Sequence, residues 1–127
     1  MERIMKHVMT TAEWYVMEVL WEESPLTARQ IAETLKERIN WSQSTTLTIL
    51  RRMHAKGLVS SDTGKRGAVY APCLEKKAAT LEETKDFLNR VYHGSVGMML
   101  SALTEQHPLS KEEIDQLYAI LENTKEA

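Results

Sequence analysis

The stretch that decides the fold is residues 41–57, WSQSTTLTILRRMHAKG. Ser42 can cap the start of a helix, because its hydroxyl accepts a hydrogen bond from a free N–H group of the first turn. Gly57 stands where helices commonly end in a left-handed residue. At 3.6 residues per turn, this helix divides into an apolar face and a polar face. The apolar face holds Thr46, Leu47, Ile49, Leu50 and Met53.

The polar face has a composition typical of a helix that enters a DNA groove. It carries hydroxyl groups near the helix start and guanidinium groups behind them, and residues 41–57 contain no carboxylate. Small hydrogen-bonding groups permit close approach to bases, and arginine binds guanine edges or phosphates. An ordinary solvated face mixes Glu with Lys and Arg, so the pattern favours a DNA-recognition helix. The predicted contacts are Ser42, Ser44, Thr45, Thr48, Arg51 and Arg52.

Two shorter helices should precede this one. Residues 10–13 (TTAE) and 27–30 (TARQ) have the form of capping boxes, which mark helix starts. Only a short turn separates the second helix from residues 41–57, so the pair resembles a helix-turn-helix. The second helix should meet a DNA phosphate at its N-terminus, near Thr27. The first helix should bury Trp14, Val16, Met17, Leu20 and Trp21 and place Glu13, Glu18 and Glu22 on the opposite side.

A short hairpin is predicted after Gly57. Residues 58–61 and 68–71 are rich in strand formers and flank a loop with two glycines. Beside a recognition helix such a hairpin is a wing, and Lys65 and Arg66 at its tip are predicted to reach phosphate or the minor groove. The alternative is an exposed turn that carries two cations. The fold class predicted for the chain is mainly α with a small β wing, and the winged-helix domain should span residues 1–73.

Residues 74–127 should form a helical dimerisation arm. Leu74, Ala78 and Leu81 begin an apolar stripe, and a capping box at residues 110–113 (SKEE) starts the last helix. An arm of this size lacks enough partners within one chain to cover its stripes, so we predict a homodimer. The alternative is an arm that packs on the first domain. The predicted dimer contacts are Leu81, Leu88, Val91, Met99, Leu100, Leu103, Ile114, Leu117, Tyr118 and Leu121.

Charge is distributed unevenly along the chain, although the net charge is only −2. Residues 38–72 hold six basic side chains and one acid, whereas residues 73–127 hold six basic and ten acidic side chains. The first section could face phosphates while the second is kept away from them. The same features would fit a winged helix that binds a protein, or one that binds DNA without sequence preference.

Composition excludes several other classes. No apolar run is long enough to span a membrane, and the first residues lack a signal-peptide core, so we expect a cytoplasmic protein. Cys73 is the single cysteine and is expected to be a small buried hydrophobic residue. The sequence contains no phosphate-binding loop, no zinc-protease motif and no activated nucleophile, so neither an enzyme, a cofactor nor a metal is expected.

Several stretches resemble the family of penicillinase, methicillin-resistance and copper-transport repressors. They are residues 10–35, 41–59 (WSQSTTLTILRRMHAKGLV) and 67–72 (GAVYAP), with residues 87–100 and 109–121 resembling that family's dimerisation arm. The resemblance implies a dimeric repressor that binds a short palindromic operator ahead of resistance or metal-transport genes.

The resemblance also implies an inducer or a sensor protease as a further partner, and the sequence departs from the family there. The β-lactam branch is cut at an Asn-Phe bond, which is replaced here by Ala102-Leu103. The copper branch binds metal through Cys-x-Cys motifs near its C-terminus, and residues 123–127 contain no cysteine. Neither release mechanism is therefore expected in its usual form, since soft Cu(I) requires thiolates.

Overall fold

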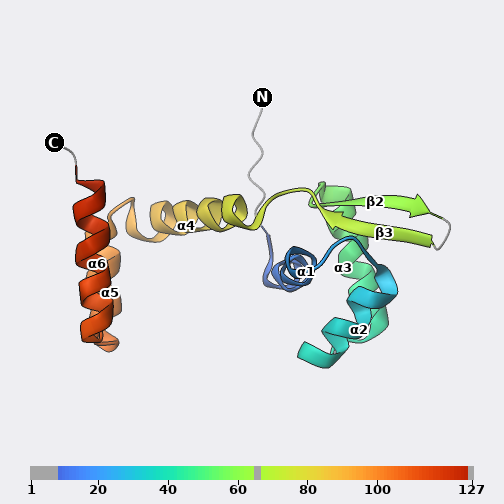
Figure 1. Cartoon of the computed structure of the whole chain (residues 1–127), viewed down its shortest axis with the longest axis horizontal. Helices are drawn as coiled ribbons and strands as arrows, with labels where there is room; N and C mark the ends of the chain where they lie inside the picture. Colours follow the sequence, from blue (N-terminus) through green and yellow to red (C-terminus); the bar gives the residue numbers. More distant parts are fainter. Residues whose placement is uncertain (1–8, 65–66, 126–127) are drawn as a thin grey trace. The chain divides into compact units, whose positions relative to one another are not determined.

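The computed structural model describes residues 9–64 and 67–125 (Figure 1). Within these ranges six helices accompany one small antiparallel sheet, as the sequence predicted for the fold class. No described helix has both the length and the apolar character needed to cross a bilayer. In chain order the elements are α1 Thr11–Glu22, β1 Leu26–Thr27, α2 Ala28–Ile39, α3 Gln43–Lys56, β2 Val59–Gly64, β3 Gly67–Pro72, α4 Lys76–Tyr92, α5 Val96–Gln106 and α6 Lys111–Thr124.

The chain divides into two compact units, one that ends at Glu83 and one that begins at Thr84. The first unit includes Leu74 and Ala79, which follow the predicted domain boundary at residue 73. Both side chains pack on the core of the first unit, and the indole Nε1 of Trp21 donates to the carbonyl of Leu74 at 2.9 Å. The segment that leads into α4 is therefore attached to α1 by this hydrogen bond, and Ala79 in the first turn of α4 belongs to the core.

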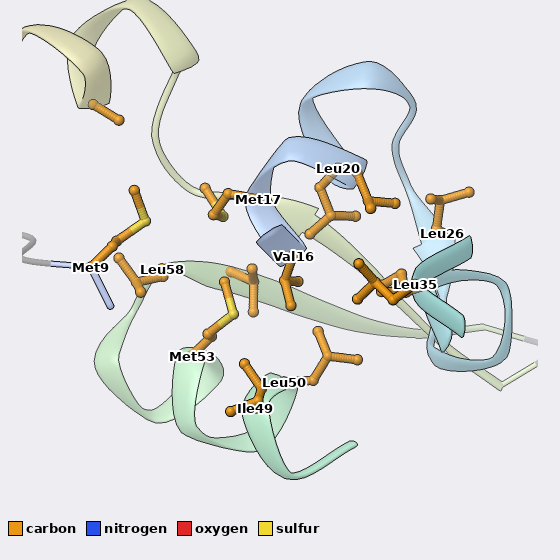
Figure 2. Packing of buried hydrophobic residues seen from close by; sticks show 14 residues of the cluster. Met9, Val16, Met17, Leu20, Leu26, Leu35, Ile49, Leu50, Met53 and Leu58 are labelled. Atoms are coloured by element: carbon orange, nitrogen blue, oxygen red, sulfur yellow. The ribbon is translucent and has the colours of Figure 1, made fainter. Parts of the chain in front are cut away.

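The core of the first unit lies between α1, α2, α3 and the sheet (Figure 2). In α1 the predicted stripe is confirmed, with Val16, Met17 and Leu20 buried and two tryptophans half-buried against the core. One acid was placed wrongly. Glu13 is fully buried rather than facing solvent, because it follows the same three-and-four spacing as Val16, Met17 and Leu20.

Local capping explains where the helices of this unit start and end. Thr10 and Thr27 form the predicted capping boxes, and the Ser42 hydroxyl accepts a hydrogen bond from the N–H of Thr45 at 3.2 Å. At the helix ends, Asn40 and Gly57 adopt left-handed conformations, with φ of 58° and 81°. These residues place a sharp turn between α2 and α3 and a tight exit from α3 into β2. The helix-turn-helix is thus built from side chains close in sequence.

The sheet has the strand order β1-β3-β2. The predicted hairpin is confirmed as β2 and β3, which pair from Val59 opposite Pro72 to Gly64 opposite Gly67. Strand β1 was not predicted; it joins the other edge of β3, with Leu26 opposite Tyr70. The predicted tip residues Lys65 and Arg66 lie outside the described residues.

The second unit has no buried residue among those described, and in α4 only Ala79 of the first unit is buried. Ala78 was predicted to face inward, but it is exposed and its neighbour Ala79 takes that place. The α6 capping box at Ser110 is confirmed. Most of the exposed large apolar side chains belong to this unit; they are Phe87, Val91, Val96, Met98, Leu103, Ile114, Tyr118, Ile120 and Leu121.

Candidate nucleic-acid interface

A cluster of hydroxyl groups opens the exposed face of α3. The Ser42 Oγ lies 3.2 Å from the Ser44 Oγ and donates to the Thr45 Oγ1 at 3.0 Å. All three side chains are exposed. Because each hydroxyl both donates and accepts, the cluster can exchange these mutual bonds for bonds to base edges or phosphate oxygens. The structure therefore brings the three predicted residues of the helix start together.

The centre of the same face carries Ser44, Thr48 and Arg51, which follow one another at spacings of four and three. Arg52 lies beside them, and both guanidinium groups are exposed. Within the described parts of the chain, neither arginine has an ion-pair partner. Both remain available to bind an acceptor outside the chain.

The same periodicity extended by four residues reaches Ala55, which is exposed and was missed by the sequence analysis. Its methyl group leaves the last turn of this face without a long side chain. The signal that would have found it is the spacing that links Thr48 and Arg51. A small residue here permits close approach of a groove wall to the helix.

Thr27 stands at the start of α2, but its hydroxyl is already occupied. It accepts from the N–H of Gln30 at 3.1 Å and donates to the Gln30 amide oxygen at 3.2 Å. The Thr27 side chain is also half-buried. Any contact with a phosphate at this helix start therefore falls to the backbone N–H groups of the first turn rather than to the threonine hydroxyl.

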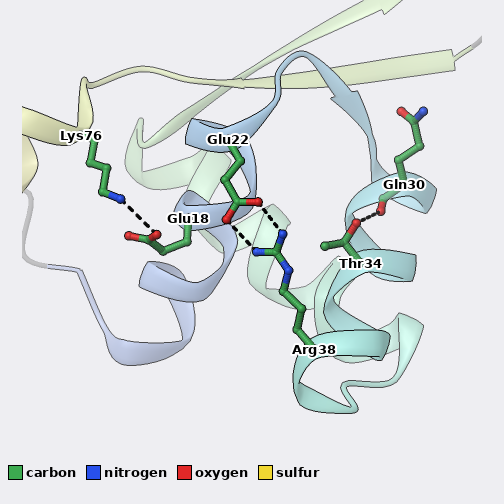
Figure 3. Close-up of polar contacts among 6 residues, drawn as sticks. All are labelled: Glu18, Glu22, Gln30, Thr34, Arg38 and Lys76. Carbon is green, nitrogen blue, oxygen red and sulfur yellow. Dashed lines mark hydrogen bonds and ion pairs between the residues drawn. The ribbon is translucent and has the colours of Figure 1, made fainter.

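Two of the cations counted as available for phosphate are bound within the chain. Both terminal nitrogens of Arg38 donate to the Glu22 carboxylate, and these hydrogen bonds lower the pKa of Glu22 (Figure 3). Lys56 is bound to Glu13. Lys76 of α4 pairs similarly with Glu18 at 3.3 Å (Figure 3). The positive charge of residues 38–72 is thus partly neutralised, which sequence counting could not detect.

The Lys56–Glu13 pair is the buried electrostatic feature of this unit. The Lys56 Nζ lies 2.8 Å from both oxygens of Glu13, one of which also accepts from the N–H of Thr10 at 2.9 Å. Burial alone would raise the pKa of Glu13, but the bonds from Lys56 and Thr10 together hold that pKa below its ordinary value. The carboxylate therefore stays charged near neutral pH in the folded protein, although its side chain is fully covered.

Other candidate groups contribute no site. Cys73 is exposed, contrary to the expectation of a buried thiol, because it follows β3 at the surface of the unit. His54, which flanks the buried face of α3, is exposed as well. In the parts of the chain that the structure describes, His, Cys, Asp and Glu side chains form no group that could hold a metal ion.

The comparisons with known proteins agree with this geometry. The model of the penicillinase repressor family matches residues 9–123. The chain belongs to this family. The penicillinase repressor of Bacillus licheniformis is 34% identical over 114 residues, which cover 90% of this chain and 89% of that protein. The methicillin resistance regulatory protein MecI of Staphylococcus aureus is 29% identical and covers 88% of this chain and 91% of its own.

A solved structure of the same family shows a repressor on DNA. The Bacillus licheniformis BlaI monomeric form in complex with the blaP half-operator superposes with a TM-score of 0.52 at 27% identity, covering 57% of this chain and 89% of that one. Family membership confirms the predicted resemblance and the winged-helix fold, and the family is one of transcriptional regulators rather than enzymes.

Proposed function

We propose that this chain is a dimeric transcriptional repressor that binds a palindromic operator, with the exposed face of α3 in the major groove. The observation that carries the proposal is the composition of that face. Its hydroxyl groups are exposed, its two arginines have no ion-pair partner among the described residues, and α3 holds no acid. The relatives support the assignment, since they include repressors of penicillinase and methicillin resistance and a repressor solved on a half-operator.

The contacts follow from the order of groups along the helix. Ser44, Thr45 and Thr48 are assigned to base edges, and Arg51 and Arg52 to guanines or phosphates. Ser42 and the first turn of α2 approach backbone oxygens through N–H groups. Lys65 and Arg66 of the wing are assigned to the flanking phosphates on the basis of sequence alone.

The second unit, together with Leu81 shortly before it, supplies the dimer in this proposal. Of the predicted contacts, Leu81, Val91, Leu103, Ile114, Tyr118 and Leu121 are exposed in the single chain, and Leu88, Met99, Leu100 and Leu117 are half-exposed. Exposed apolar surface of this extent is typical of a protein-protein interface. Two recognition helices held by such an arm would read half-sites roughly 34 Å apart, about one helical turn of DNA, or a multiple of it.

The test is selection of bound sequences from a random duplex pool in the reducing conditions of the cytoplasm, where we place this activity. A palindromic sequence bound by two subunits is the expected result, and its genomic positions would tell β-lactam resistance genes from copper-transport genes. General, salt-weakened binding without enrichment would favour a non-specific DNA-binding module, and no DNA binding at all would favour a protein-interaction module.

One variant checks the assignment of the helix. Arg52→Ala is expected to weaken binding to the selected duplex by about 1–3 kcal/mol and to relax the base preference at one position of the operator. Binding to random duplex should fall less. Equal losses on both duplexes would make Arg52 a phosphate contact instead.

A further inference from the structure

Glu13 joins two helix ends that lie far apart in the sequence. It is the third residue of α1, where its carboxylate closes the capping box of Thr10. The same carboxylate accepts from Lys56, the last residue of α3 before the left-handed Gly57. One fully buried carboxylate thus ties the start of the first helix to the end of the recognition helix.

Lys56 lies where it could bind a DNA phosphate instead of Glu13. It stands four residues after Arg52, so the two side chains leave α3 on neighbouring turns of the same side. A free lysine there would add a cation beside a predicted DNA contact. Instead its ammonium lies 2.8 Å from both carboxylate oxygens of Glu13, with only 39% of its side chain exposed.

We propose that Glu13 is a positioning and specificity-determining residue for DNA recognition: it anchors the last turn of α3 on α1 and holds Lys56 away from the phosphate backbone. This inference rests on the proposed function, and it adds a role for a residue that touches no DNA.

The Glu13–Lys56 pair has two separate effects, one through anchoring and one through charge. A lysine that is free to bind phosphate strengthens binding to every sequence alike, because phosphate contacts carry no sequence information. The Glu13 carboxylate removes that contribution while it fixes the distance between α1 and the end of α3. Discrimination is then left to the groups on the helix face, whose position depends on this anchor.

The experiment compares the full-length chain with Glu13→Gln, Lys56→Met, the double variant and Lys56→Arg. Two labelled duplexes of equal length are used, one enriched by selection with the wild-type chain and one of random sequence, each across a salt series. Lys76→Met is the matched control, because Lys76 pairs with Glu18 on the same helix α1 but lies on α4. Lys76→Met removes one lysine that is paired with a glutamate of α1, as Lys56→Met does, and it should leave the salt slope and the preference unchanged.

The expected results differ between the two partners. Glu13→Gln should bind random duplex roughly five- to tenfold more tightly at about 0.1 M salt, with a salt slope steeper by about 0.9, since one freed lysine neutralises one phosphate. Its preference for the selected duplex should fall. The double variant should lose the gain on random duplex. Lys56→Met should lose preference but keep the wild-type slope, and Lys56→Arg should keep both, because arginine retains the ion pair.

The opposite outcomes overturn the inference. A slope that falls by about 0.9 in Lys56→Met would make Lys56 a phosphate contact in the wild type. Wild-type slope and preference in Glu13→Gln would leave Glu13 with no role beyond stability. If Glu13→Gln does not fold, the comparison of Lys56→Met with Lys56→Arg still shows whether the ion pair, rather than a phosphate contact, accounts for the role of Lys56. A wild-type chain that enriches no sequence would refute the proposed function, and the slopes on random duplex would still show whether Lys56 is held off phosphate.

Discussion

The unit that ends at Glu83 and the unit that begins at Thr84 use apolar residues in opposite ways. All the fully buried apolar side chains among the described residues lie between Met9 and Ala79, whereas nine of the eleven exposed large ones lie in the second unit. Both units consist largely of regular helices, and both contain helices that begin with a capping box. The difference is in burial. The first unit buries its apolar side chains in its own core, whereas the apolar side chains of the second unit remain exposed in the single chain.

The largest effect is expected on the stability of the first unit, when a side chain of its core is shortened. Leu50 of α3 is fully buried in the core, beside Met53 in Figure 2. Leu50→Ala should lower the free energy of unfolding by about 2–5 kcal/mol, because it removes buried methyl groups and leaves a cavity. Chemical denaturation followed by circular dichroism measures this loss. A cost below about 1 kcal/mol would mean that the core can collapse around the smaller side chain.

The next effect tests the second unit. Leu103 of α5 has an exposed fraction of 54% in the single chain, so Leu103→Asp should cost little within one subunit. In a symmetric dimer interface each subunit would bury one such carboxylate without a partner, and at about 1–1.5 kcal/mol for each copy the two together would cost about 2–3 kcal/mol. The dimer dissociation constant should then rise roughly 30- to 150-fold, which sedimentation across a concentration series would measure.

Ser101→Asp is the matched control for that variant, since Ser101 is exposed on the opposite face of α5. It should leave the dimer intact. Loss of the dimer in both variants would show that the effect is not specific to the Leu103 face of α5, and loss in neither would favour an arm that is covered in another way.

A smaller effect compares two glutamates that share one local role. Glu13 and Glu113 are both the third residue of a capping-box helix, and the pKa of each is lowered. Only Glu13 is buried, with a lysine against it. Since its folded pKa lies below the ordinary value of about 4.5, its contribution to stability is complete above that pH and is lost as pH falls through the folded pKa.

Glu13→Gln should therefore cost about 1–3 kcal/mol near neutral pH, and the difference from wild type should vanish at acid pH, where wild-type Glu13 is protonated too. Urea denaturation at several pH values measures both limits. Glu113→Gln should cost less, because its carboxylate is exposed and glutamine can also close a capping box. A constant difference at all pH values would mean that packing, rather than charge, accounts for the role of Glu13.

The predictions from sequence succeeded where neighbours in the chain decide the structure. Thr10, Thr27, Ser42 and Ser110 were recognised as caps because each bonds a residue three positions on. The hydroxyl and arginine face of α3 followed from helical periodicity in the same way. Strand β1 was missed, since two residues carry no periodicity and Leu26 finds its partner Tyr70 only in the folded chain.

The ion pairs were missed for the same reason. Glu13 meets Lys56 across 43 positions of sequence, and Glu22 meets Arg38 across 16, so charge counts along the chain overestimated the cations available to DNA. The spacing of Glu13 with Val16, Met17 and Leu20 was visible, but an acid on an apolar stripe reveals its partner only when the helices pack.

The smallest effect concerns the one described buried side-chain polar atom that has no hydrogen-bond partner, the Thr46 Oγ1 on the inner face of α3. A hydroxyl that loses water without gaining a partner costs about 1–3 kcal/mol, whereas valine fills nearly the same volume with the same branching at Cβ. Thr46→Val should therefore raise the free energy of unfolding by about 1 kcal/mol and the melting temperature by about 4–8 °C.

Thr48→Val is the control for that gain in stability, because Thr48 lies on the exposed face of α3. It should leave stability nearly unchanged and weaken binding to the selected duplex, because Thr48 is assigned to base edges. If Thr46→Val instead lowers stability, a buried water bonds the Thr46 hydroxyl in solution, and the first unit covers itself less completely than its apolar core indicates.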